Sequence, residues 1–526
     1  MTTLIPKVDF KNGGTTPAGA INRPINEKLQ EIVSVKDFGA VGDGTTDDAA
    51  AITAAIAAMT TGGTLYFPTG SYIVASTIIV DKDDVILDFN NQSVSYSASY
   101  VNIGSGDFGI YNVMFAITAN RVTCVNGQFK QGAFTDSSVF VWYGTTATYG
   151  VVDKCKFYNL PYLTVGGVLG SLLGVAIQTR TGSTGIKIVN NYFYNCAGSV
   201  SLQGTANLVD NCSSYITSAQ PTSLAGVTDQ AYGTDGSTGC SITNTKVIRS
   251  VGAPYSGATI GANTSATNFN ISNNYIYGLT GGIGFSVLSS NNGIFCGNII
   301  DGGGFTAVGA WILARIDADS SSILFSKNLL KGAPTTVIGS GLDAYTGNNN
   351  IVDNTFQLDT GNVYSCMNIQ PATTPSTILV SGNTFSCVGN GVSLQFTDNN
   401  NQPVMLKNNV YQGAMTTPYQ GTTVTINAPL YLENEFFIGA NITTYAINSN
   451  KFFRPLFYGS MGKFPFSIKQ NAIFYSAEVP TGANYTGATW AVGDTVYNSI
   501  PSVGQPKGWT CTVAGTPGTW VSMGNL

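Results

Sequence analysis

The amino-acid sequence predicts an all-β fold, a parallel β-helix in which short strands stack coil upon coil. Two observations carry this prediction. Glycine accounts for 62 residues and only 10% of the chain is charged, a composition typical of many short strands joined by turns. A short motif also recurs at intervals of 24 to 30 residues from Asn274 onward, which indicates a solenoid.

The recurring motif is an apolar residue, two further residues, an asparagine, one residue and a second apolar residue. Its asparagines are Asn191, Asn274, Asn298, Asn328, Asn354, Asn383 and Asn409. Neighbouring strands lie about 4.8 Å apart, so we expect these asparagines to stack, with their side-chain amides bonded along the stack. The apolar residue two positions after each asparagine should point into the core.

The first distinctive stretch, "VKDFGAVGDGTTDDAAAI" (35–52), contains four aspartates: Asp37, Asp43, Asp47 and Asp48. Its glycine spacing fits neither a dinucleotide loop nor a phosphate loop, and a calcium loop would need a closing glutamate. The cluster is therefore expected to shape the fold. Residues 33–38 should form a strand and the glycines a turn. Thr46 or Asp47 should cap a helix through Met59, and this helix should cover the open end of the β-helix.

The composition excludes several kinds of chemistry. The chain has no histidine, which removes Ser-His-Asp and Cys-His catalysis and histidine metal sites. Acid–base chemistry is left to Asp, Glu, Lys, Tyr or Arg, and no metal or cofactor is expected. The net charge of −5, with no Lys/Arg cluster, argues against nucleic acid and membranes as partners, and no apolar run is long enough to span a bilayer.

The cysteines give the expected compartment. Nine cysteines are scattered singly without a C-x-x-C motif, which predicts free, mostly buried thiols. The first residues, "MTTLIPKVDFKNGG", contain no apolar leader. We expect synthesis in a reducing cytoplasm.

The most polar expected strand is "WILARIDADS" (311–320), which alternates strictly. The positions predicted to face the core are Ile312, Ala314, Ile316 and Ala318. The positions predicted to share the outer face are Trp311, Leu313, Arg315, Asp317 and Asp319. Two carboxyl groups and a guanidinium would then lie on one exposed face.

The repeat predicts a third carboxyl group at the same place. Asp317 and Asp343 each precede a repeat asparagine by 11 residues. With the coils in register, Asp343 should stack on Asp317, and Tyr345 on Asp319. Like charges this close raise one pKa, which keeps one carboxyl protonated as a general acid. Arg180, also 11 residues before a repeat asparagine, should lie on the same face.

These patterns give the predicted site. The catalytic candidates are Asp317, Asp319 and Asp343, and the substrate-binding candidates are Trp311, Arg315, Tyr345 and Arg180. A solvated acidic strip with a surface salt bridge is the alternative interpretation. Two further pairs stay open as sites: Asp229 with Asp235, and Glu433 with Glu435, which could also act across a subunit interface.

Two terminal stretches resemble known proteins. "VSVKDFGAVGDGTTDDAAAITAAI" followed by "GGTLYFPTGSYIV" resembles the entry of the pectate-lyase-like right-handed β-helix superfamily. With the preceding "AINRPINEKLQEI" it is similar to bacteriophage tailspike proteins. The stretch at 490–520 resembles a small module at the end of many phage depolymerases. Together these motifs cover about 85 residues, and the β-helix between them matches in architecture only.

The tailspike resemblance implies a homotrimeric virion protein of the phage tail that binds, and usually cleaves, a bacterial surface polysaccharide. It implies four parts: an attachment segment over 1–33 that meets a tail or baseplate protein, with a small helix at 24–32; a β-helix over 34–440; a cap or trimer contact over 441–470; and a β-domain over 471–526.

Three functions remain open at this point. Hydrolysis by paired carboxylates is preferred, because an acidic site repels a polyanionic substrate. A lyase acting by β-elimination would use a base such as Tyr345 with Arg180, Arg249 or Arg315. A non-enzymatic adhesin is the third alternative. The small C-terminal domain holds Trp490, Trp509 and Trp520, which are expected to form a core or trimer clamp or to stack on sugars.

Overall fold

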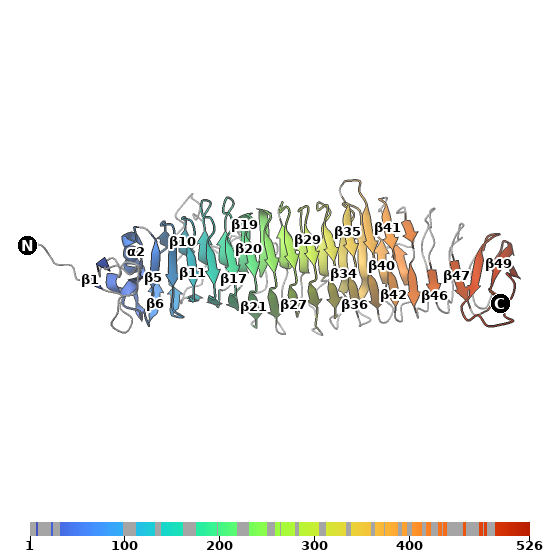
Figure 1. Cartoon of the computed structure of the whole chain (residues 1–526), viewed down its shortest axis with the longest axis horizontal. Coiled ribbons are helices and arrows are strands. Elements are labelled where there is room, and N and C mark those ends of the chain that lie inside the picture. Colours follow the sequence, from blue (N-terminus) through green and yellow to red (C-terminus); the bar gives the residue numbers. More distant parts are fainter. Residues whose placement is uncertain are drawn as a thin grey trace, which may run out of the picture. The chain divides into compact units, whose positions relative to one another are not determined.

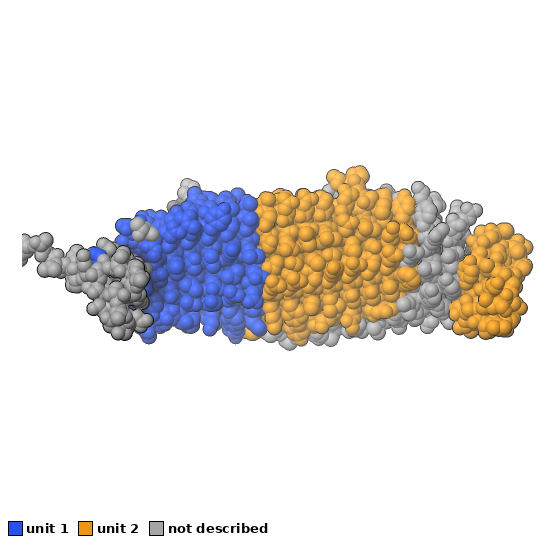
Figure 2. All heavy atoms as spheres, in the orientation of Figure 1, with its two compact units in different colours: residues 1–215 blue, residues 216–526 orange. Residues whose placement is uncertain are grey.

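The structure is a computed structural model of the 526-residue chain. It describes residues 7–8, 23–24, 32–60, 62–97, 112–131, 138–160, 175–196, 198–217, 231–249, 258–263, 265–278, 283–303, 312–332, 338–358, 363–372, 374–387, 392–396, 402–412, 417–421, 430–433, 435–438, 456–458, 473–476, 478–480 and 490–526. The chain divides into two compact units, Met1–Tyr215 and Ile216–Leu526, which Figure 2 shows in different colours.

Each unit is built from three parallel sheets, here called sheets A, B and C, to which successive coils contribute one strand each (Figure 1). In the first unit, sheet A contains β7 (Ile78–Val80), β10 (Asn112–Ile117), β13 (Ser138–Tyr143), β16 (Val175–Thr179) and β19 (Gly198–Thr205). Sheet B contains β3 (Ile32–Ser34), β5 (Gly63–Tyr66), β8 (Val85–Asp88), β11 (Thr123–Val125), β14 (Val151–Asp153), β17 (Lys187–Val189) and β20 (Leu208–Asp210). Sheet C contains β4 (Asp43–Asp47), β6 (Ser71–Val74), β9 (Ser93–Tyr96), β12 (Gln128–Gln131), β15 (Lys156–Tyr158), β18 (Tyr192–Tyr194) and β21 (Ser213–Ile216).

The second unit repeats this arrangement. Sheet A contains β22 (Tyr232–Thr238), β25 (Ala258–Asn263), β28 (Ile283–Val287), β31 (Ile312–Ile316), β34 (Ile338–Tyr345), β37 (Val363–Gln370), β40 (Val392–Phe396) and β43 (Thr417–Gly421). Sheet B contains β23 (Ser241–Thr243), β26 (Asn270–Ser272), β29 (Ile294–Cys296), β32 (Leu324–Ser326), β35 (Asn349–Val352), β38 (Ile378–Ser381), β41 (Val404–Lys407) and β44 (Leu430–Glu433). Sheet C contains β24 (Lys246–Arg249), β27 (Tyr275–Tyr277), β30 (Ile299–Asp301), β33 (Leu329–Lys331), β36 (Thr355–Leu358), β39 (Thr384–Cys387), β42 (Val410–Gln412), β45 (Phe436–Ile438), β46 (Leu456–Tyr458) and β47 (Ile473–Ser476). The predicted right-handed parallel β-helix is confirmed.

The interior of each coil is filled by the apolar residues of the repeat. Those predicted to point inward are all buried: Phe193, Ile276, Ile300, Leu330, Phe356, Phe385 and Tyr411. Aromatic members stack from coil to coil, since ring centroids of Phe356 and Phe385 lie 4.9 Å apart. This spacing follows directly from the distance between neighbouring strands.

The asparagine ladder forms as predicted in the second unit. The side-chain amide of each asparagine donates to the carbonyl oxygen of the next, with Asn298 Nδ2 2.9 Å from Asn328 Oδ1 and Asn328 Nδ2 3.0 Å from Asn354 Oδ1. The same oxygen also accepts the backbone N–H of the preceding asparagine. All of these asparagines are buried, so the ladder satisfies polar groups at a buried corner of each coil.

Glu435 takes the next position of this ladder. It is fully buried, and its carboxylate accepts hydrogen bonds from Asn409 N (3.1 Å), Asn409 Nδ2 (3.0 Å) and Tyr411 Oη (2.6 Å). Glu433 instead is exposed and pairs with Lys407 at 2.7 Å. The two glutamates therefore have separate structural roles, and their pairing as a second site is wrong.

The aspartate cluster near the N-terminus binds backbone. Asp48 is buried, and its carboxylate accepts the N–H groups of Val41 (2.7 Å), Gly42 (3.3 Å) and Ile73 (3.3 Å). Asp43 accepts two N–H groups in its own turn, and these bonds lower its pKa. The structural role predicted for the cluster is confirmed.

The capping helix is shorter than predicted. Helix α2 (Ala49–Ala58) begins after Asp48, whose side chain bonds the preceding loop and β6 instead of the helix. Its buried residues are Ala49, Ile52, Ala55 and Ile56, and the helix contacts β7, the first strand of sheet A. Strand β3 covers only residues 33 and 34 of the expected strand at 33–38. Val35–Phe38 form a 3₁₀ helix, η1, which Ser34 caps by accepting the N–H of Lys36. The two-residue strands β1 (Lys7–Val8) and β2 (Arg23–Pro24) pair antiparallel, and the helix expected at 24–32 lies largely outside the described residues.

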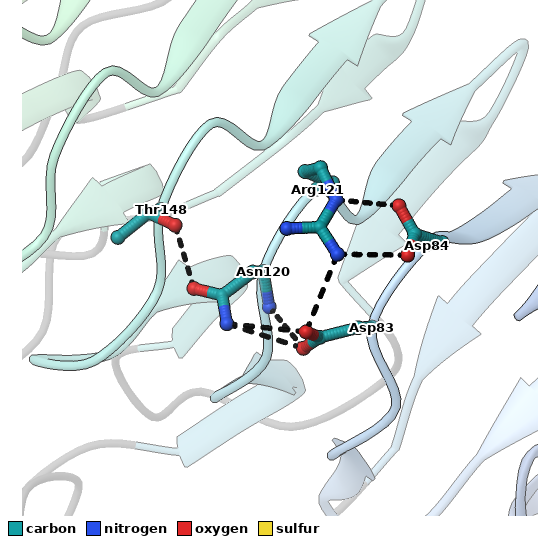
Figure 3. Close-up of polar contacts among 5 residues, drawn as sticks. All are labelled: Asp83, Asp84, Asn120, Arg121 and Thr148. Carbon is teal, nitrogen blue, oxygen red and sulfur yellow. Dashed lines mark hydrogen bonds and ion pairs between the residues drawn. The ribbon is translucent and has the colours of Figure 1, made fainter. Parts of the chain in front are cut away.

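The corners of the coils are joined by polar side chains on the surface. In Figure 3, Arg121 binds Asp84 through Nε (2.6 Å) and Nη2 (2.8 Å), while Asn120 Nδ2 donates to Asp83 and Thr148 Oγ1 donates to Asn120. Three successive coils are thereby linked. Hydrogen bonds from the backbone N–H and side chain of Asn120 lower the pKa of Asp83, and the bond from Arg121 lowers the pKa of Asp84. Because the group links successive coils, its role is structural.

The C-terminal residues form an antiparallel meander of β48 (Thr495–Asn498), β49 (Gly508–Val513) and β50 (Thr519–Ser522). β47 pairs parallel with both β46 and β48, so sheet C continues past residue 440 and into this module. Trp490 is buried and packs edge-on against Trp520, with ring centroids 4.8 Å apart, as expected for a small core. The division into four functional parts stays a prediction.

One cysteine differs from expectation. Among the cysteines whose side chains the structure describes, seven are free, and six of these are buried. Cys366 is disulfide-bonded, so the prediction of free thiols is wrong at that position.

Candidate active site

A strip of polar side chains lies on the outer face of sheet A in the second unit. Every second residue of these strands faces the core, and these residues are largely apolar, as are the buried Ala314 and Ile316 of β31. The opposite side carries polar residues on neighbouring strands: Asp235, Asn263, Ser286, Arg315, Asp343, Tyr345, Asn368 and Gln395. We call this set the polar strip.

Arg315 and Asp343 are direct neighbours at the centre of the strip. β31 pairs with β34 so that Arg315 is opposite Asp343 and Ile316 is opposite Ala344. The predicted register, with Asp343 on Asp317 and Tyr345 on Asp319, is therefore wrong by two residues. The corner between the strands explains the shift. Leu324 lies eight positions after Ile316, but its partner Asn350 lies only six positions after Ala344, the partner of Ile316. Two residues fewer in this corner place the guanidinium, and not a second carboxylate, beside Asp343.

Asp343 is the most buried acid of the strip, with 9% of its surface exposed. Burial raises the pKa of this carboxyl, while hydrogen bonds from Ser340 and Asn368 and the charge of Arg315 oppose the rise. Ser340 Oγ donates to Asp343 Oδ1, and Asn368 Nδ2 lies 3.3 Å from the same oxygen. Burial of this carboxyl favours its neutral form, which is the form that a general acid uses, whereas its hydrogen bonds and Arg315 favour the charged form.

Asp317 and Tyr345 complete the group around Arg315. Arg315 Nη2 donates to Asp317 Oδ1 at 3.1 Å, and both side chains are partly exposed. Asp317 also accepts the N–H of Ala318 at 2.8 Å, which holds its carboxylate at the start of the turn. Burial raises the pKa of Tyr345, with the charge of Arg315 acting against this rise. Arg315, Asp317, Asp343 and Tyr345 are here called the Arg315 cluster.

The remaining predicted residues have different outcomes. β31 ends at Ile316, and Ser320 N bonds Asp317 O across a turn, so Asp319 is an exposed turn residue and does not share the strand face. Leu313 shares the strand face of Arg315, as predicted, but it is buried there. Trp311 lies outside the described residues. Arg180 follows β16 in the first unit, whereas the Arg315 cluster belongs wholly to the second.

Several residues of the strip escaped the sequence analysis. Ser286 is fully buried next to Arg315, and Ser340 and Asn368 both bond Asp343. Among the described residues, Ser286 Oγ, Arg315 Nε and Asn368 Oδ1 are buried polar atoms without a hydrogen-bond partner. These residues could have been predicted from the polar residues that occupy every second position of successive sheet A strands. Buried atoms with no partner indicate a place where a polar ligand could bond.

Of the candidate pair Asp229 and Asp235, the structure describes only Asp235. Asp235, on β22, accepts a hydrogen bond from Asn263 Nδ2 at 3.2 Å, and Asp229 lies outside the described residues. Asp235 belongs to the polar strip, three strands from β31, which corresponds to about 14 Å. Within the described ranges, no three Asp, Glu or Cys side chains gather as a metal site would require, and no helix is long and apolar enough to cross a membrane.

Comparison with protein families adds a match at the front of the chain. Residues 32–139 match the model of the family described as rhamnogalacturonase A/epimerase, pectate lyase-like. The front of the chain is therefore similar to this family. This match covers the aspartate cluster, helix α2 and the first coils of the β-helix.

Two curated proteins match parts of the chain. A tail spike protein of an Escherichia phage is 60% identical over 40 residues, covering 8% of this chain and 5% of that protein. Plasmin and fibronectin-binding protein A of Streptococcus pneumoniae (strain ATCC BAA-255 / R6) is 30% identical over 178 residues, covering 30% of this chain and 22% of that protein. The chain therefore matches less than a quarter of the length of either relative.

Among solved structures, a tailspike protein mutant of E. coli bacteriophage HK620 in complex with pentasaccharide has the same fold. The superposition has a TM-score of 0.51 with 14% identity, and it covers 98% of this chain and 94% of the tailspike. At this identity the likeness concerns the fold.

Proposed function

We propose that the protein is a phage tailspike that binds and cleaves a bacterial surface polysaccharide, such as a capsule, exopolysaccharide or O-antigen, by endo-glycosidic hydrolysis. The observation that carries this proposal is the Arg315 cluster. It combines a buried carboxyl whose pKa is raised with a partly exposed carboxylate held by a guanidinium. Two carboxyl groups in different surroundings are what glycoside hydrolysis uses.

In this proposal Asp343 is the general acid. Its protonated carboxyl donates to the glycosidic oxygen as the bond to the leaving sugar breaks. Ser340 and Asn368 orient the carboxyl through Oδ1, which leaves Oδ2 for the substrate. Arg315 contacts the sugar hydroxyls and then stabilises the carboxylate that forms on Asp343.

Asp317 is the general base. It lies one strand and two residues from Asp343, which separates the two backbones by about 8 Å. A separation of about 6.5–9.5 Å between the carboxyl groups leaves room for a water molecule and inverts the anomeric configuration. Asp317 would take a proton from this water as the water attacks the anomeric carbon.

A lyase is the second candidate, because Tyr345 lies beside Arg315 as elimination from a uronic acid would need. Burial raises the pKa of Tyr345, however, so its phenol keeps its proton at neutral pH and is a poor base. We therefore prefer hydrolysis. A non-enzymatic adhesin is the third candidate, because part of the chain matches a plasmin and fibronectin-binding protein.

Homotrimeric assembly belongs to the same proposal. On the outer face of sheet B in the second unit, apolar residues follow one another on successive coils. Ile294, Leu324, Leu379 and Met405 occupy one row of Cα partners that is interrupted by Asn350. Exposed fractions of 42%, 36% and 42% at Ile294, Leu324 and Met405 leave this row open to a second copy. The N-terminal segment would attach the trimer to a tail or baseplate protein in the virion.

The test is digestion of a panel of purified capsular, exopolysaccharide and O-antigen polysaccharides. Hydrolysis predicts new reducing ends and oligosaccharides with saturated termini for at least one polysaccharide. Rising ultraviolet absorbance from unsaturated sugars would replace the hydrolase with the lyase. Binding without any released oligosaccharide would favour the adhesin, and neither binding nor cleavage across a broad panel would overturn the proposal.

A further inference from the structure

A row of tyrosines covers the outer face of sheet C in the first unit. Tyr158 of β15, Tyr192 and Tyr194 of β18, and Tyr215 of β21 alternate with residues that point into the core. The rings are half-buried and near one another, with centroids of Tyr192 and Tyr215 5.4 Å apart and those of Tyr158 and Tyr194 6.4 Å apart. Phe157 and Phe193 of the same strands are already stacked inside, so the core does not require the outer tyrosines.

Tyr158, Tyr192 and Tyr194 line a pocket of about 540 Å³, whose other walls are Lys156 and Asn159. Aromatic faces with a few polar groups are typical of small-ligand sites. Tyrosine also combines a large apolar face with a polar hydroxyl, which suits a sugar ring. Because Tyr158 and Tyr192 belong to successive coils about 4.8 Å apart, the pocket can contact consecutive sugars of a chain.

The charged residues on the strands around the pocket have one sign. Lys156 is exposed, and Lys130 Nζ lies 5.9 Å from the centre of the Tyr158 ring. The described strands β9, β12, β15, β18 and β21 contain no aspartate or glutamate. In a chain with a net charge of −5, two lysines on strands without acids favour an anionic ligand.

We infer that this tyrosine face is a second saccharide site, which binds an acidic polysaccharide by stacking and by contacts with Lys156 and Lys130. The inference rests on the proposed function for the class of ligand, but it concerns a surface that does not include the Arg315 cluster. A second copy of the chain is the less favourable occupant, since a threefold axis on this face would bring six lysines together.

The test measures binding of a polysaccharide that the protein recognises in the panel, by calorimetry or surface plasmon resonance. All proteins carry Asp343→Asn so that digestion does not consume the ligand. Tyr192→Ala combined with Tyr158→Ala should weaken binding on the order of tenfold, whereas Tyr192→Phe should bind nearly as the parent. Lys156→Gln with Lys130→Gln should weaken binding at low salt and have little effect at high salt. Tyr149→Ala, an exposed tyrosine of the same unit outside the pocket, is the matched control.

The outcomes separate this inference from the proposed function. Unchanged affinity in both double variants, with an intact fold by circular dichroism, overturns the tyrosine site alone. If the tyrosine double variant binds less tightly but also loses the trimer in sedimentation, the face is a subunit contact and the inference is overturned. If no polysaccharide is bound, the proposed function and this inference fail together.

Discussion

At the scale of single residues, the chemistry depends on the two acids of the Arg315 cluster. Asp317→Asn and Asp343→Asn should each reduce turnover by about a hundredfold or more, because each removes a proton donor or acceptor of the reaction. Asp319→Asn removes a carboxyl two residues from Asp317 in an exposed turn and should leave turnover near wild type. The measurement is release of reducing ends from the recognised polysaccharide. Near wild-type rates for both Asp317→Asn and Asp343→Asn would move the site to Asp235.

The raised pKa of Asp343 predicts a dependence of stability on pH. The folded protein holds this proton more tightly than the unfolded chain, whose carboxyl has a pKa near 3.8. Stability from this group is therefore complete below pH 3.8 and is lost as pH rises through the raised pKa. Compared with Asp343→Asn, the wild type should lose thermal stability over this window. Parallel curves of melting temperature against pH for the two proteins would contradict the assignment.

The sequence was enough to predict that Asp317, Asp343, Arg315 and Tyr345 belong to one site, but not how they are arranged. Counting from the repeat asparagine assumes equal corners, and one corner is two residues shorter. Ser286, Ser340 and Asn368 were missed because serine and asparagine are abundant in every turn of this chain. Their role appears only when neighbouring coils are aligned.

At the scale of the element, the asparagine ladder should be a large source of stability. Asn328→Ala removes a carbonyl oxygen that accepts two hydrogen bonds from Asn298, and an amide that donates to Phe295 O and Asn354 Oδ1. Buried groups left without partners should lower the free energy of unfolding by about 3 kcal/mol. Gln357→Ala, at an exposed position of the next coil, is the control. Equal thermal stability of the two variants would contradict the ladder's role.

The entry of the β-helix depends on Asp48 in a similar way. Asp48→Ala leaves the N–H groups of Val41, Gly42 and Ile73 without their acceptor and should destabilise the protein by about 3 kcal/mol. Asp37→Ala changes an exposed aspartate of the same stretch and should have little effect. Thermal unfolding compares the two, and equal melting temperatures would contradict the account.

Elements were predictable where a pattern repeats. The ladder asparagines and their inward apolar partners follow from the motif, and so does the parallel fold. The start of α2 was misplaced because the sequence does not show that Asp48 bonds backbone distant along the chain at Ile73. Glu435 was a candidate for chemistry because Glu433 lies two residues away, whereas in the structure it replaces asparagine at a ladder position.

At the scale of the whole molecule, the apolar row on sheet B should support a trimer. Leu324→Glu combined with Met405→Glu places charges on exposed apolar positions and should reduce the trimer to smaller species. Val503→Glu, at a position that is 94% exposed, should leave assembly unchanged. Sedimentation velocity measures the oligomeric state of the wild type and the variants. A wild type that is monomeric at micromolar concentration would contradict the proposed trimer.

A crystal structure of Asp343→Asn with an oligosaccharide of the recognised polysaccharide tests the central claim most directly. We expect the glycosidic oxygen to lie within hydrogen-bonding reach, about 2.6–3.2 Å, of the side chain at position 343. Arg315 should contact the same sugar, and a water molecule should lie between Asp317 and the anomeric carbon. An oligosaccharide that crosses the protein without reaching the Arg315 cluster would contradict the account.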